Sequence, residues 1–274
     1  MRKGLVVLAG TALAGAGLGL AAPASADDAA AAAGTSSVWA AWNVAYYTAG
    51  DGQENNLVVT EIDTGNGSDR YYVFNDSVPI SPGENCFHPD EADATVVNCL
   101  IRGVGDIPGV DIEVGDGDDD VVVRTTGIGT VIAGDGDDDV TMSGLFHLAS
   151  GGAGRDTLVG AFEVYGGLDN DTLRPRPGGE AYGDEGNDTL IGNTADERLY
   201  GGPGNDVVYG QEGDDLIHGD EGDDELHGGT GNDEIHGDAG DDLIFGNSGD
   251  DRLYGGPGAD EISGGPGNNV IRQD

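Results

Sequence analysis

The chain has 274 residues, of which 52 are glycine, and its 52 acidic residues against 11 basic ones give a formal net charge of −41. A polyanion of this kind is repelled by nucleic-acid phosphates and by anionic membrane surfaces, so binding to either is excluded as a main function. The same charge attracts cations. With so little apolar surface to bury, the metal-free chain falls close to the disordered class of sequences.

Residues 1–26 have the features of a secretory signal peptide. Arg2 and Lys3 form a short basic region, an apolar stretch rich in glycine and alanine follows, and the tripeptide Ala24–Ala26 supplies a small-residue cleavage site. An uncleaved anchor is the alternative, because the stretch approaches the length that spans a bilayer. The signal peptide predicts a secreted, extracellular protein with no membrane insertion after cleavage.

Residues 27–37 are predicted to be a flexible leader, and residues 38–105 a small β-rich segment. Two strand-like runs, Leu57 to Ile62 and Arg70 to Phe74, flank a stretch rich in glycine and asparagine that suits a hairpin turn. A calcium loop at Asp63–Asp69 is the alternative for that turn.

The same segment carries much of the aromatic content of the chain, which we interpret as its core or cap. The alternative is an aromatic surface that binds a ligand. The residues concerned are Trp39, Trp42, Tyr46, Tyr47, Tyr71, Tyr72 and Phe74. The only two cysteines, Cys86 and Cys99, also lie here, and in a secreted chain they predict a disulfide. Closing so short a loop stabilises by about 3 kcal/mol on the chain-entropy model.

From residue 106 to residue 182 the chain repeats a template of glycine and aspartate at irregular spacing. The copies VGDGDDDVVV at 114–123 and AGDGDDDVTM at 133–142 are clear, and later copies follow 15 to 19 residues apart. The copy at 166–174 has Asp169 where the template has glycine. These copies fit an eighteen-residue turn with a metal-binding loop on one edge only.

From Gly183 to the end the period is a strict nine residues. Each unit reads Gly-x-x-Gly-x-Asp, with a few departures, and continues into a three-residue strand whose middle member is always aliphatic, from Leu190 to Ile271. A short fixed period indicates a solenoid, and strand alternation turns the aliphatic residue inward. Two units close one flattened turn, so residues eighteen apart stack, and two columns of loops run along opposite edges.

The nine-residue unit resembles the RTX, or hemolysin-type, calcium-binding nonapeptide repeat, with consensus G-G-x-G-x-D-x-U-x. The resemblance covers residues 183–272 continuously and residues 114–174 more loosely. It implies an all-β fold, a parallel β-roll or β-helix solenoid with calcium-binding turns, preceded by the small β-rich segment. It also implies that the sixth-position aspartate is the side-chain ligand of Ca²⁺.

Stacked aspartates are spaced for calcium. Stacked strands lie about 4.7–4.9 Å apart and calcium binds oxygen at about 2.3–2.6 Å, so an ion between two stacked carboxylates reaches both. The alternative, a solvated acidic face, leaves like charges unscreened at a cost of about 1 kcal/mol per pair even in water. The candidate ligands are Asp188, Asp206, Asp224, Asp242 and Asp260 in one column, Asp215, Asp233 and Asp251 in the other, and Asp119, Asp138, Asp156 and Asp171 in the earlier copies.

Some units depart from the pattern. The unit at 192–200 has Ala195 for glycine and Glu197 for aspartate, and the last unit has Asn269 at the aspartate position. We expect the site at Glu197 to be impaired, whereas Asn269 still offers a carbonyl oxygen.

The histidines raise the question of catalysis. His218, His227 and His236 recur every nine residues at an outward strand position, with His218 and His236 expected in one column and His227 on the opposite sheet. A transition-metal site made by the first two is the alternative to a merely decorated outer face. The sequence has neither the H-E-x-x-H motif of zinc proteases nor a G-x-S-x-G nucleophile elbow. We therefore expect no enzyme and no catalytic residues.

The sequence favours a secreted calcium-binding structural protein that folds into a β-roll when calcium binds. One alternative is an extracellular adhesion or interaction module, in which the N-terminal segment recognises a protein or cell-surface partner and the β-roll is its scaffold. The other is a secreted hydrolase of unrecognised type in residues 38–105.

Overall fold

The computed structural model describes residues 35–41, 43–64, 69–102 and 108–273. Within these ranges the chain forms strands and turns without any helix, and accordingly none that could cross a membrane. The predicted signal peptide and Trp42 lie outside the described residues, as does most of the predicted leader. The remainder of that leader is not irregular, because the first strand already begins at Ser36.

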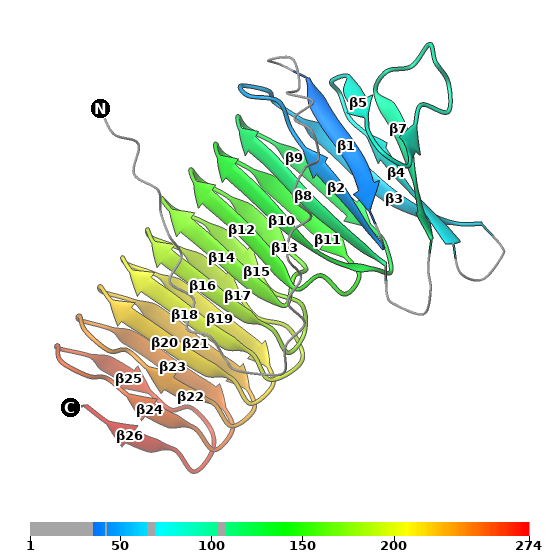
Figure 1. Cartoon of the computed structure of the whole chain (residues 1–274). Coiled ribbons are helices and arrows are strands. Elements are labelled where there is room, and N and C mark those ends of the chain that lie inside the picture. The colour runs from blue at the N-terminus through cyan, green and yellow to red at the C-terminus, as the bar shows by residue number, and fades with distance from the viewer. Residues whose placement is uncertain (1–34, 42, 65–68, 103–107, 274) are drawn as a thin grey trace, which may run out of the picture. The chain divides into compact units, whose positions relative to one another are not determined.

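The strands form two sheets, here called sheet A and sheet B (Figure 1). In chain order, sheet A contains β1 (Ser36–Ala41), β2 (Val44–Thr48), β5 (Ile80–Pro82), β8 (Gly109–Asp116), β10 (Ile128–Asp135), β12 (Leu148–Ala153), β14 (Glu163–Leu168), β16 (Glu180–Glu185), β18 (Arg198–Pro203), β20 (Leu216–Glu221), β22 (Glu234–His236), β24 (Arg252–Tyr254) and β26 (Val270–Arg272). Sheet B contains β3 (Asn56–Asp63), β4 (Asp69–Asn75), β6 (Cys86–Phe87), β7 (Val96–Arg102), β9 (Asp120–Arg124), β11 (Asp139–Ser143), β13 (Thr157–Val159), β15 (Thr172–Arg174), β17 (Thr189–Ile191), β19 (Val207–Glu212), β21 (Glu225–Thr230), β23 (Leu243–Ser248) and β25 (Glu261–Ser263).

From β8 onward the chain alternates between the two sheets, and each strand pairs in parallel with the next strand of its own sheet. Leu199 of β18 pairs with Ile217 of β20, one coil of eighteen residues later. This is the parallel β-solenoid that the nine-residue period predicts. The strands appear stacked in Figure 1 from green to red.

The earlier coils differ in length, as their irregular spacing predicts. Val140 pairs with Leu158 and Leu158 pairs with Leu173, which are steps of 18 and 15 residues. Hydrogen bonds between strands nevertheless keep the register in every coil, so the length difference is taken up in the loops. In the early coils these variable loops lie on the edge where the chain passes from a strand of sheet B to the next strand of sheet A.

The core is a file of aliphatic side chains enclosed between the sheets. The middle residues of the strands from Leu190 to Leu253 are fully buried, as the alternation predicts. The last two differ, because Ile262 is only partly buried and Ile271 is 47% exposed. They lie on the final coils of the described residues, where less of the chain covers them.

Many strands are longer than the three residues predicted. Strand β18 runs for six residues, and its ladder to β20 continues through the glycine loop with Gly202 opposite Asp220. In these longer strands the backbone stays paired into the turn, and only the second half of the loop departs from the sheet.

The N-terminal segment extends both sheets and covers the first coil. Strand β2 pairs in parallel with β8, and β3 pairs in parallel with β9. The predicted hairpin is present as antiparallel β3 and β4, although residues 65–68 of its turn lie outside the described residues. The predicted disulfide joins Cys86 of β6 to Cys99 of β7.

The aromatic residues of this segment divide between its core and its surface. Tyr47, Tyr72 and Phe74 are buried, which agrees with the core interpretation. Trp39 and Tyr46 instead stack on each other with ring centroids 4.2 Å apart and are partly exposed.

Candidate calcium sites

The sixth-position aspartates are buried, although a carboxylate is among the least favourable groups to bury. Each stands at the point where a glycine turn enters its strand, so its side chain lies between neighbouring coils. The aspartates with at most 2% exposure are Asp119, Asp138, Asp156, Asp171, Asp188, Asp206, Asp215, Asp224, Asp233, Asp242 and Asp251. Asp260, on the penultimate unit, is partly exposed.

One oxygen of each carboxylate holds the backbone of the preceding coil. The N–H of Asp188 donates to Oδ1 of Asp206 at 2.7 Å, and the N–H of Asp206 donates to Oδ1 of Asp224 at 2.7 Å. The same bond links Asp119 through to Asp260 along one edge. It also links Glu197 to Asn269 along the other. The two predicted columns are thus present.

The second oxygen has no hydrogen-bond partner among the described residues. This is true of Oδ2 in Asp119, Asp138, Asp156, Asp171, Asp188, Asp206, Asp215, Asp224, Asp233, Asp242, Asp251 and Asp260, the twelve candidate ligands. Leaving a buried charged acceptor unpaired costs several kcal/mol, so native proteins rarely tolerate it. A cation at each oxygen removes that cost.

Glycine at the first position of the unit leaves the space for such a cation. A Cβ on Gly201 would overlap Oδ2 of Asp206 and come within 2.7 Å of the carbonyl oxygen of Gly219 on the next coil. A Cβ on Gly210 would meet Asp215 and Gly228 in the same way. A carboxylate oxygen and a carbonyl oxygen therefore face one small space, and calcium prefers a donor set made only of oxygen.

The electrostatics agree with this interpretation. Burial raises the pKa of Asp171 to about 8, of Asp156, Asp206 and Asp215 to about 7, and of Asp138, Asp188, Asp224 and Asp233 to about 6. The backbone N–H that each Oδ1 accepts lowers the pKa but does not offset burial. In the metal-free fold, protons compete for these carboxylates near neutral pH. A divalent cation relieves the same penalty without a proton.

Glu197 differs from the aspartates because both of its oxygens are occupied. Its Oε1 accepts the N–H of Gly178 at 2.7 Å, and its Oε2 accepts the N–H of Asn193 at 2.8 Å. The longer side chain reaches one backbone N–H on the preceding coil and a second in its own loop. The impairment expected for this unit thus has a physical cause.

The other two departures have different consequences. Asn269 accepts the N–H of Asp251 with Oδ1, and its Nδ2 donates to the carbonyl of Gly265 at 3.0 Å. Asp169 takes the left-handed backbone conformation, with φ of 76°, that glycine would otherwise supply. Its loop is therefore intact, and Asp171 retains its unpaired oxygen.

Asn55 begins the longer column and was not among the predicted site residues. Its backbone N–H and its Nδ2 donate to Oδ1 of Asp119 at 2.6 and 2.9 Å. Asn55 thus stands where a preceding aspartate would stand. A signal was present, because AGDGQENNL at 49–57 is a copy of AGDGDDDV at 133–140 with one residue added.

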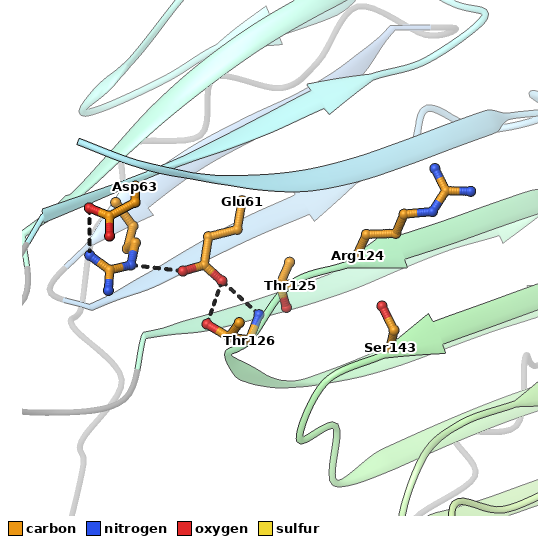
Figure 2. A pocket seen from close by; sticks show the side chains of 7 residues that line it. Glu61, Asp63, Arg124, Thr125, Thr126 and Ser143 are labelled. Atoms are coloured by element: carbon orange, nitrogen blue, oxygen red, sulfur yellow. Dashed lines mark hydrogen bonds and ion pairs between the residues drawn. The ribbon is translucent and has the colours of Figure 1, made fainter. Parts of the chain in front are cut away.

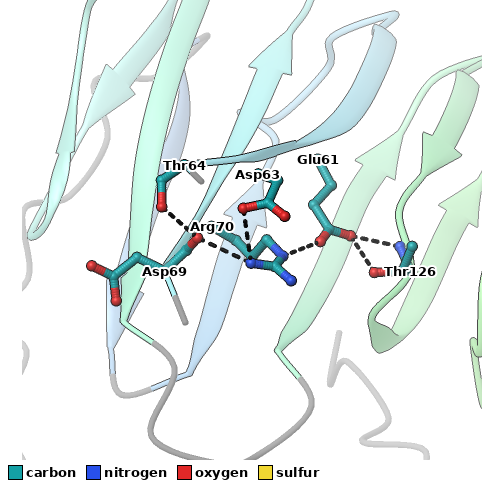
Figure 3. Close-up of polar contacts among 6 residues, drawn as sticks. All are labelled: Glu61, Asp63, Thr64, Asp69, Arg70 and Thr126. Carbon is teal, nitrogen blue, oxygen red and sulfur yellow. Dashed lines mark hydrogen bonds and ion pairs between the residues drawn. The ribbon is translucent and has the colours of Figure 1, made fainter. Parts of the chain in front are cut away.

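A pocket of about 420 Å³ lies where the β3–β4 hairpin meets the first coil (Figure 2). It is lined by Glu61, Asp63, Arg70, Arg124, Thr125, Thr126 and Ser143. Glu61 accepts from Nε of Arg70 at 2.8 Å, and from the N–H and Oγ1 of Thr126 at 2.6 and 2.7 Å. Figure 3 shows Arg70 between Glu61 and Asp63. These contacts tie the hairpin to the turn after β9.

Comparison with protein-family models finds the RTX calcium-binding nonapeptide repeat in four overlapping copies, at residues 182–217, 191–226, 218–253 and 236–271. Comparison with curated proteins finds no match for the chain. Residues 182–271 are therefore RTX calcium-binding nonapeptide repeats, as the resemblance of the nine-residue unit implies.

Proposed function

Because residues 182–271 are RTX calcium-binding repeats on a β-solenoid, we propose that this is a secreted structural protein whose solenoid forms when calcium binds. The observation that carries the proposal is the row of buried carboxylate oxygens without partners. In the metal-free fold these charges lie one above another at the spacing of the strands. A calcium ion between two stacked carboxylates would replace their mutual repulsion with attraction of both to the ion.

The early coils extend the proposal beyond the matched repeats. Asp119, Asp138, Asp156 and Asp171 have the same burial, the same Oδ1 bond and the same unpaired Oδ2 as the later aspartates. We infer calcium sites along one edge of these coils too. Magnesium suits the sites less well, because it prefers shorter bonds and retains its water.

Secretion is supported by two observations, the second of which is interpreted through the chemistry of disulfides. The N-terminal sequence has the order of a signal peptide, the two cysteines form a disulfide, and disulfides persist in oxidising compartments. We propose a structural role without catalysis, and the pocket at Glu61 supports it, since Arg70 and Thr126 engage this carboxylate.

The test is a calcium titration of the full chain. We expect metal-stripped protein to lack most of its β signal in far-ultraviolet circular dichroism, and to gain it cooperatively with calcium. Native mass spectrometry of the folded form should show several calcium ions for each chain, whereas magnesium at the same concentration should restore little. A full β signal in excess EGTA, with no calcium taken up on its return, would overturn the proposal.

A further inference from the structure

The outer face of sheet A carries two stacked histidines. His218 of β20 and His236 of β22 are register partners on neighbouring coils, and their rings lie 4.5 Å apart and within 5° of parallel. They continue a ladder of rings, with Tyr200 before them and Tyr254 after them. Tyrosine at the equivalent positions shows that stacking alone does not require histidine.

A carboxylate reaches this pair from the loop that follows. Asp238 has a left-handed backbone, with φ of 67°, and its Oδ2 lies 2.8 Å from Nδ1 of His218. One donor atom from each of His218, His236 and Asp238 lies within 4.8 Å of the other two. All three residues are only partly buried, so an ion from solvent can reach them.

Two further features suit a metal at this place. Glu234 contacts Nε2 of His236 at 3.3 Å, which leaves Nδ1 of that ring as the ligand atom. A carboxylate on the far nitrogen is the usual way in which a metal-binding histidine is oriented. A cavity of about 120 Å³ also adjoins the cluster and is lined by His236, Asp238, Tyr254, Gly255, Gly256 and Arg272.

We propose that His218, His236 and Asp238 bind a divalent transition metal of the zinc class, at a site separate from the calcium columns. Two imidazoles and one carboxylate are ligands that zinc accepts and calcium does not favour. Zinc binds nitrogen at about 2.0–2.1 Å, so two ligand nitrogens can be at most about 4.2 Å apart. The rings must therefore tilt toward each other, and Asp238 must exchange its bond to His218 for the metal.

Three protein ligands leave a fourth position for water or a small ligand. In zinc proteins this is the arrangement of open sites, whereas closed structural sites have four protein ligands. The cavity beside Asp238 provides the space on that side, and Arg272 lines it.

His227, on the outer face of sheet B, provides the control for this proposal. His227 contacts Glu225 at 2.9 Å and stacks between Tyr209 and Phe245, so both of its ring neighbours on adjacent coils lack a metal-binding nitrogen. Phenylalanine is a natural occupant of this strand position, as Phe245 shows. Histidine-to-phenylalanine changes therefore keep the ring ladder and remove only the ligand.

The test uses the full chain saturated with calcium, so that the solenoid is folded and its aspartates are occupied. Titration with Co²⁺, followed by its visible absorption, should show one equivalent bound in a low-coordinate site and displaced by Zn²⁺. His218→Phe and His236→Phe should each weaken binding by at least about tenfold, whereas His227→Phe should not change it. Circular dichroism in calcium should be the same for all variants.

The proposal is overturned if the folded parent binds no Co²⁺ beyond the calcium sites. It is also overturned if His218→Phe and His236→Phe bind Co²⁺ as tightly as the parent, or if His227→Phe loses as much affinity as they do. A parent protein that fails to fold in calcium would instead contradict the proposed function, so the two failures are distinct.

Discussion

The backbone N–H of Asp206 donates to Oδ1 of Asp224 at 2.7 Å, across one coil of eighteen residues. The other oxygen of Asp224 has no hydrogen-bond partner in the part of the chain that the structure describes, and it lies against Gly219. One carboxylate therefore serves two purposes: it sets the register of the preceding coil, and it presents a charge to the space between coils. The two purposes can be separated by mutation.

Asp224→Asn keeps an oxygen that can accept the N–H of Asp206 but removes the charge. We expect it to weaken the calcium sites on both sides of this carboxylate, which calcium titration should show as a higher midpoint and mass spectrometry as fewer bound ions. Asp224→Ala should cost about 1–3 kcal/mol more, because the buried N–H loses its acceptor. Glu225→Gln, at a partly exposed neighbouring position on the outer face, is the control and should leave the midpoint unchanged.

The unit at 192–200, which contains Glu197, should bind calcium once its sequence matches the repeat pattern. The double variant Ala195→Gly with Glu197→Asp restores the repeat pattern, and the shorter side chain frees its second oxygen from the N–H of Asn193. We expect native mass spectrometry to find one additional calcium ion in each chain. Glu197→Gln keeps the length of the side chain and should bring no gain; a gain in that control would contradict the explanation.

Gly210→Ala tests the space beside Asp215. The new methyl group would occupy the position where the carboxylate and the carbonyl of Gly228 converge, so calcium binding at this site should be lost. Gly52→Ala is the comparison, because Gly52 has φ of 67° and open space around it. It should cost about 1–2 kcal/mol of stability through backbone strain alone, with the calcium count unchanged.

Protons should partly replace calcium. Burial raises the pKa of Asp171 to about 8, of Asp206 to about 7 and of Asp224 to about 6 in the fold, against about 3.9 when unfolded, so the metal-free folded state binds more protons. Its stability is therefore present at low pH and is lost as the pH rises through this range. We expect metal-stripped protein to gain β signal in circular dichroism between pH 8 and pH 5. An unchanged spectrum over that interval would refute the electrostatic account.

The period of nine predicted most of the solenoid, because it fixes which residues stack. The columns of Asp206 and Asp224 and the pairing of His218 with His236 follow from counting alone. Asn55 could not be found in this way, since its place depends on strands β2 and β3 pairing with the first coil. The same is true of the second hydrogen bond of Glu197, which depends on the length of one side chain, and of the contact between Asp238 and His218, which depends on the orientation of two side chains.

The early coils vary in length while one edge of the solenoid keeps an unbroken column of aspartates. Extra residues are accommodated on the opposite edge, where Leu145 lies in a loop and is 48% exposed. Peptides inserted there would project at the pitch of the coils and leave the ion-binding margin undisturbed. The early coils, unlike the later ones with candidate sites on both edges, therefore have one edge that must keep its sequence and one that accepts insertions.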